Sequence, residues 1–164
     1  MESESELAYH ETGHAVVAYD LRIPFTRVVI DPQRGDGSTD AVPSMGALDA
    51  VTGAGEREYE DAIRLFLAGD VALAILKGVE RASPDWKSGE EDRKKAARIA
   101  MRLVQARRRD EGAEACLKRL GEDVRVILMR HWLEVVAIAS ALMQRNSLKW
   151  EEVRDLIQSV QKSN

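Results

Sequence analysis

Residues 7–21 read LAYHETGHAVVAYDL, and this stretch decides how the rest of the chain is interpreted. The residues that flank the central HETGH are largely apolar and compatible with a helix, so a helix is expected here independently of the motif. We expect it to run from Ser5 to Arg22 and to stop before Pro24. Because His10 and His14 are four positions apart, both imidazoles fall on one face of this helix, one turn apart.

Two imidazoles at this spacing can bind one zinc ion, and the residue beside them, Glu11, is placed to act as a general base. The motif therefore predicts a zinc-dependent hydrolase with His10 and His14 as metal ligands and Glu11 as the catalytic residue. The competing interpretation is that both histidines are ordinary surface or core residues of an amphipathic helix.

Composition narrows the class of protein. A length of 164 residues suits one domain covering 1–164. Hydrophobic residues make up 45% of the chain but aromatic residues only 5%, and this composition favours helices over sheet. A net charge of −4 argues against nucleic acid as the main partner. The single cysteine, Cys116, excludes an internal disulfide, and the acidic start MESESE is unlike a secretory signal. With apolar stretches too short for a membrane segment, we expect a cytoplasmic protein.

The remaining elements are mostly helical. Arg27–Asp31 is rich in β-branched residues and predicts a short strand, which a long, glycine-rich irregular loop follows over residues 32–55. Helices are expected at Glu56–Leu76, from a Ser88/Glu91 capping box to Arg109, across the periodic stretch Gly112–Arg145, and after a cap at Ser147. The fold class expected is mainly α, a helical single domain with a small β element beside the zinc helix.

Four segments resemble the peptidase domain of the FtsH family of ATP-dependent zinc proteases. The similarity is most specific in AYHETGHAVV at residues 8–17 and continues in RVVIDPQRG at 27–35, LAGDVALAILKG at 67–78 and SGEEDRKKAARIA at 88–100. The resemblance implies a zinc metalloendopeptidase that acts on polypeptides. The family also carries membrane helices and an ATPase, but this chain has no G-x-x-x-x-G-K motif, so an ATPase partner would be a separate chain.

A catalytic zinc site needs a third protein ligand, and Asp92 is the candidate. Its helical phase matches that of the apolar residues Ala96, Ile99 and Leu103, whereas Glu90 and Glu91 share faces with basic residues and are expected in solvent. The resemblance implies the same residue, since Asp92 aligns with the family's third ligand. Two alternatives are Asp70, which also lies on an apolar face, and His131, the remaining histidine. A further alternative is that Asp92 only complements the helix dipole.

Leu73 and Ala74 stand where the resembled family has paired glutamates near the zinc, which could orient its ligands. Their presence leaves open a second hypothesis, a peptidase-derived binding module with a vestigial zinc site. The strand Arg27–Asp31 has two interpretations of its own: a plain structural strand, or a strand that pairs with an extended peptide substrate by β-augmentation.

Overall fold

The computed structural model describes residues 3–46, 55–82, 86, 89–107 and 111–163, and everything below concerns these residues. They form six helices and one antiparallel sheet of three strands, so the predicted mainly helical fold with a small β element is confirmed. The elements in chain order are α1 (Glu4–Asp20), β1 (Arg27–Asp31), β2 (Asp36–Thr39), α2 (Glu56–Leu76), α3 (Glu90–Arg107), α4 (Ala113–Arg130), α5 (Trp132–Arg145), β3 (Ser147–Lys149) and α6 (Trp150–Ser163).

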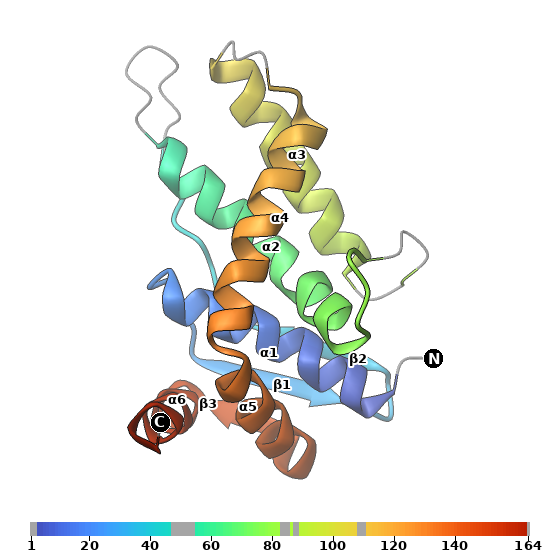
Figure 1. The fold of residues 1–164 in the computed structure, drawn as a ribbon, viewed down its shortest axis with the longest axis vertical. Coiled ribbons are helices and arrows are strands. Elements are labelled where there is room, and N and C mark those ends of the chain that lie inside the picture. Colours follow the sequence, from blue (N-terminus) through green and yellow to red (C-terminus); the bar gives the residue numbers. More distant parts are fainter. Residues whose placement is uncertain (1–2, 47–54, 83–85, 87–88, 108–110, 164) are drawn as a thin grey trace.

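Figure 1 shows the layers. The sheet, in the order β2-β1-β3, lies with α1 in the lower half of the molecule, α5 and α6 lie below them, and α2, α3 and α4 rise above. Two apolar clusters fill the fold: one joins α1, the sheet, α5 and α6 with parts of α2 and α4, and the other joins α2, α3 and α4. Helices α2 and α4 contribute to both clusters, so they connect the helical upper half to the lower half that contains the HETGH helix.

Helices α1 and α2 approach each other very closely. Gly13 of α1 faces Ala68 and Ala72, and a Cβ built on Gly13 would lie only 2.6 Å from the Ala68 carbonyl oxygen. Small residues on both sides of the crossing let the two backbones come together. The glycine inside HETGH therefore lets the histidine-bearing face of α1 pack closely against α2.

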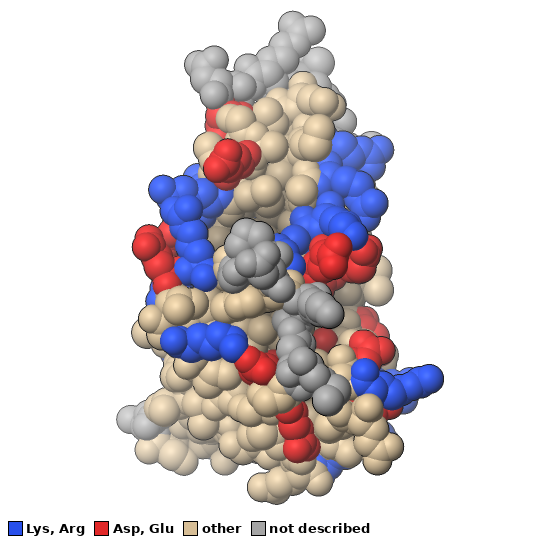
Figure 2. All heavy atoms as spheres, turned by 90° about the vertical axis from the view of Figure 1, so that its right-hand side faces the viewer, with Lys and Arg blue, Asp and Glu red and all other residues tan. Residues whose placement is uncertain are grey.

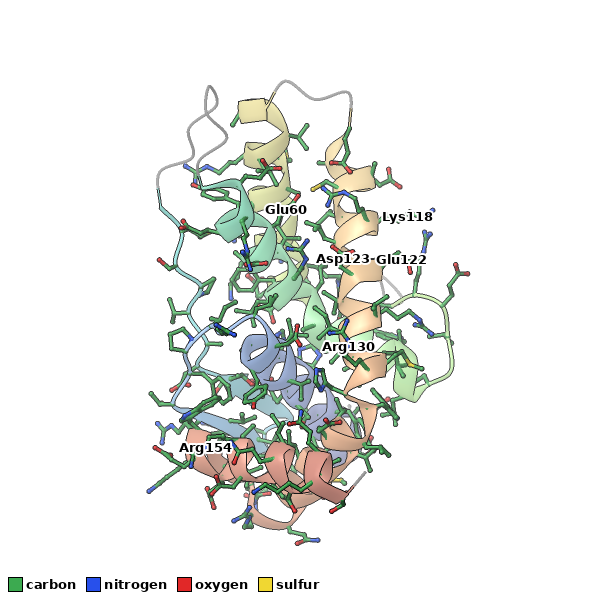
Figure 3. All side chains as sticks on the ribbon, turned by 60° about the vertical axis from the view of Figure 1, so that its left-hand side comes forward. Glu60, Lys118, Glu122, Asp123, Arg130 and Arg154 are labelled. Carbon is green, nitrogen blue, oxygen red and sulfur yellow. The ribbon has the colours of Figure 1, made fainter. Side chains whose placement is uncertain are left out.

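Helices α2 and α4 are joined by ion pairs as well as by apolar contacts. The Arg64 guanidinium donates to Asp123 at 2.8 Å, and Arg119 donates to Glu60 at 3.0 Å. Glu60 on α2 and Asp123 on α4 are labelled in Figure 3. Such partly exposed pairs each contribute little to stability, and here they add to the apolar contacts between the two helices.

The predictions for β1 and α2 match the observed bounds, but two strands were not predicted. Strand β2 lies inside the segment that was expected to be irregular, and it pairs with β1, Ile30 opposite Gly37. Ser147, expected to cap the last helix, instead begins β3, because the buried Leu148 pairs with Val28. The Glu152 carboxylate accepts a hydrogen bond from the Lys149 backbone N–H at the start of α6.

The helix ends show two further differences. The capping box predicted at Ser88 lies outside the described residues, whereas α1 has one at Ser3 and Glu6. The periodic stretch Gly112–Arg145 is two helices that meet at His131 with a bend of 78°. Among the described residues no single helix is long and apolar enough to cross a membrane, and α4 with α5 pass that test only together, as a bent pair.

Candidate metal centre

Three side chains from two helices converge at the junction of α1 and α3. The metal-binding atoms of His10, His14 and Asp92 all lie within 4.8 Å of one another. His14 Nε2 is 3.1 Å from His10 Nε2 and 3.3 Å from Asp92 Oδ2. The structure thus brings together the two histidines of the motif and the carboxylate that helical phase selected.

The two short separations suit a tetrahedral metal site. When nitrogen and oxygen ligands lie about 2.0–2.1 Å from a zinc ion, neighbouring ligand atoms are about 3.3 Å apart. The separations of 3.1 Å and 3.3 Å around His14 Nε2 are close to that value. Two imidazole nitrogens and one carboxylate oxygen are also a ligand set that catalytic zinc sites use, with a fourth position left for water. The residues present could therefore hold a metal ion such as zinc.

His14 is held in the orientation that metal binding requires. Its Nδ1 lies 2.8 Å from the Leu65 carbonyl oxygen of α2, which can only accept a hydrogen bond. Nδ1 therefore donates its proton, and Nε2 is directed at His10 and Asp92. Burial lowers the pKa of His14, but Asp92 and Glu11 outweigh it, so the pKa of this imidazole is raised.

His10 is also buried, and its ring packs against Gly69 of α2. A Cβ built on Gly69 would come within 2.4 Å of the His10 ring, so the ring occupies the space that any larger residue at 69 would fill. Burial is the main cause that lowers the pKa of His10 to about 3, and the neighbouring positive His14 adds to it. His10 is therefore neutral at physiological pH, the form in which imidazole binds metals.

Asp92 is ionised and partly open to solvent. Burial by itself raises its pKa, but the hydrogen bond and charge of His14, together with Lys95, lower it to about 2. Its neighbours on the helix behave as the phase predicts: Ala96, Ile99 and Leu103 are buried, while the side chains of Glu90 and Glu91 are 60% and 72% exposed. Asp92 is therefore the carboxylate of this turn that faces the two histidines.

Glu11 is buried beside the three converging groups and is held by β2. The Thr39 hydroxyl lies 2.9 Å from Glu11 Oε2 and 3.0 Å from the Glu11 backbone carbonyl oxygen. Burial raises the pKa of Glu11, against the opposing effects of His14 and Thr39. A carboxylate with a raised pKa accepts a proton more readily at neutral pH. Sequence reasoning missed Thr39, because DGST carries no strand pattern and gives no sign that it folds over α1.

The centre opens to solvent through a pocket of about 220 Å³. It is lined by Glu11, His14 and Asp92, by Gly37 to Thr39 of β2, and by Phe66 and Lys95. A proton acceptor and two of the three converging side chains thus line one accessible space. Neither Leu73 nor Ala74 lines this pocket, although both are buried.

Neither alternative ligand belongs to this group, although Asp70 lies close to His10, since a Cβ built on Gly89 would contact both side chains. Asp70 is buried, and its Oδ2 accepts a hydrogen bond from Arg93 at 2.6 Å. His131 is at the bend between α4 and α5, where its ring nitrogens lie 3.2 Å from Asp20 and 3.3 Å from Glu134. Within the described residues, the group that could hold a metal ion includes neither Asp70 nor His131.

The β-augmentation interpretation of Arg27–Asp31 is wrong in this fold. Strand β1 is the central strand, paired with β2 along one edge and with β3 along the other. Its backbone groups are already used, so an added peptide has no edge of β1 to pair with. Strand β2 is the outer strand on the side of the pocket, and its far edge pairs with no other strand among the described residues.

The position of Asp92 leads to a first prediction. Asp92→Asn should weaken zinc binding by at least about tenfold, and by more than Asp70→Asn or His131→Ala, because an amide oxygen is a poorer zinc ligand than a carboxylate. Zinc titration against a competing chelator measures the three affinities. The matched control is Glu91→Gln, which changes an exposed carboxylate of the same helix turn. A larger loss in Asp70→Asn or His131→Ala would transfer the third-ligand role to that residue.

Comparison with known proteins does not identify a family or a function for this site. No model of a protein family matches the chain, and no curated protein matches it.

Proposed function

We propose that this protein is a zinc-dependent metalloendopeptidase that hydrolyses unfolded or short polypeptides, with zinc bound by His10, His14 and Asp92. One observation carries the proposal: Glu11, His14 and Asp92 line one solvent-accessible pocket, and the ligand atoms of His10, His14 and Asp92 all lie within 4.8 Å of one another. A purely structural metal site has no use for a buried carboxylate beside its open position. The resemblance of the HETGH helix to the FtsH peptidase domain supports the same class of reaction.

The roles of the residues follow from their surroundings. His10 supplies a neutral nitrogen and Asp92 supplies a charged oxygen, while His14 binds a metal through Nε2 once that atom has given up its proton. A bound zinc ion supplies Lewis-acid chemistry, lowering the pKa of a water ligand and polarising a carbonyl. Glu11 accepts a proton from the attacking water and passes it to the nitrogen of the leaving amine as the C–N bond breaks. The Thr39 hydroxyl holds the Glu11 carboxylate in place for both transfers.

The outer edge of β2, which pairs with no other strand in the described part of the chain, is where we expect the substrate to bind. An extended peptide can add to a sheet edge through backbone hydrogen bonds, and β2 contributes Gly37 to Thr39 to the metal pocket. A peptide bound at this edge would pass beside Glu11, and a flexible peptide needs no unfolding to bind there. A folded substrate has its backbone already paired and must open first, which costs several kcal/mol.

Activity is therefore expected to be independent of ATP and restricted to flexible substrates. Casein should be digested readily, whereas a stable folded protein should resist under the same conditions. Each substrate is incubated with the zinc-loaded chain, with and without ATP, and products are followed by gel and mass spectrometry. Fast digestion of the folded protein, or stimulation by ATP in the purified chain, would contradict the prediction. Stimulation only when an ATPase is added would identify a separate partner.

A non-catalytic binding module is the second candidate, favoured by Leu73 and Ala74 in place of acidic residues. Metal dependence separates the two. For the enzyme, removal of zinc with a chelator should abolish casein cleavage, and about one zinc ion per chain should restore it. Casein that is bound by the zinc-loaded chain and never cleaved would favour the binding module.

A further inference from the structure

A groove on α3 continues the metal pocket away from the three ligands. Its basic lining residues are Lys95, Arg98 and Arg102, and its apolar ones include Phe66, Ile99 and Met101. Phe66 and Lys95 line both this α3 groove and the metal pocket, so the two spaces are adjacent. Lys95 Nζ lies 5.2 Å from the centre of the Phe66 ring and 3.2 Å from Asp92 Oδ1, which places it at the junction.

The charge of the α3 groove is one-sided. No Asp or Glu side chain lines it among the described residues. Arg98 and Arg102 are exposed, and neither makes an ion pair in the part of the chain that the structure describes. Helix α3 forms the right-hand side of Figure 1, which faces the viewer in Figure 2, and Lys and Arg side chains gather there toward the upper right. Since the whole chain carries a net charge of −4, the positive charge of the α3 groove is a local feature.

We infer that the α3 groove binds acidic side chains of the polypeptide substrate, so the enzyme prefers peptides with carboxylates a few residues from the cleaved bond. The inference rests on the proposed function, because the groove begins at the metal pocket. Guanidinium groups pair with carboxylates through two parallel hydrogen bonds. The apolar residues that line the same groove can contact aliphatic or aromatic side chains of the peptide.

Spacing indicates where the carboxylates belong. Arg98 and Arg102 are six and ten residues beyond Asp92 (92 to 98 and 92 to 102), about 9 and 15 Å along the helix at 1.5 Å per residue. An extended peptide advances about 3.3 Å per residue, so these distances correspond to about three to five residues from the bond at the metal. A suitable substrate therefore has apolar residues around the cleaved bond, which contact the apolar lining of the groove. Beyond them it has two acidic residues, which pair with Arg98 and Arg102.

The test uses quenched fluorogenic peptides that share one apolar core. Each carries a Glu-Glu or a Lys-Lys pair at the third and fourth positions from the central bond. The pair is placed before the bond in one set of peptides and after it in the other. The zinc-loaded full chain should cleave one Glu-Glu peptide with a kcat/KM about tenfold above its Lys-Lys counterpart. The double variant Arg98→Glu, Arg102→Glu should reverse this preference. The control variant Arg130→Glu, Arg154→Glu changes exposed arginines of α4 and α6, labelled in Figure 3, and should leave it unchanged.

A second measurement separates this inference from the proposed function. Fluorescence anisotropy records binding of the same peptides to the zinc-loaded Glu11→Gln variant, with and without the two Arg98 and Arg102 reversals. Cleavage or binding that ignores peptide charge, or a preference that survives the reversals, overturns the inference and leaves the peptidase proposal standing. Charge-selective binding at the groove without any cleavage by the unaltered chain overturns the peptidase proposal and supports the groove. If no peptide is bound or cleaved, both are overturned.

Discussion

The Glu11→Gln variant is expected to retain its zinc and to lose peptide hydrolysis by at least about a hundredfold. Glutamine has nearly the same shape as glutamate, so it can keep the contact with the Thr39 hydroxyl. Its amide does not accept a proton at neutral pH, so the transfer from water to the leaving amine fails. The measurement is kcat on a fluorogenic peptide, with zinc content determined by elemental analysis on the same sample.

The matched control is Glu134→Gln. Glu134 is a second buried glutamate, located in the first turn of α5, where it faces His131 rather than the metal pocket. Its substitution tests the cost of removing a buried carboxylate in general, and its kcat should stay near that of the unaltered chain. Unchanged turnover in Glu11→Gln with zinc still bound would remove Glu11 from the mechanism.

His10→Ala and His14→Ala should each abolish tight zinc binding, with a loss of affinity above about a hundredfold. Each change removes one of the three proposed protein ligands, and the remaining two cannot hold the ion in a tetrahedral site. His14→Ala also leaves the Leu65 carbonyl oxygen without its imidazole partner. The affinities are measured by competition with a zinc-binding dye, and the fold is checked by circular dichroism.

His131→Ala is the control for the loss of a histidine. His131 has carboxylate partners of its own and lies outside the metal group, so its removal should leave zinc affinity unchanged. Full zinc occupancy in either His10→Ala or His14→Ala would show that the assignment of the site is wrong.

Local sequence determined the parts of the centre that depend on helical geometry alone. The pitch of an α-helix places His10 and His14 on one face whatever the rest of the chain does. The same periodicity separates Asp92 from Glu90 and Glu91 on α3, and the structure confirms which of the three faces the apolar side. The bounds of β1 and α2 also agree with prediction, because a β-branched run and a long amphipathic stretch are strong local signals.

Tertiary structure alone decided how these pieces meet. The order β2-β1-β3 depends on pairing between distant segments, so no local pattern could show that β1 is central or that DGST forms the strand beside Glu11. The contacts of His14 with Leu65 and of Glu11 with Thr39 likewise join residues far apart in the chain. The sequence by itself therefore determined which side chains can bind a metal. The close packing of α1 against α2, with α3 and β2 around it, decided that a proton acceptor and a pocket stand beside them.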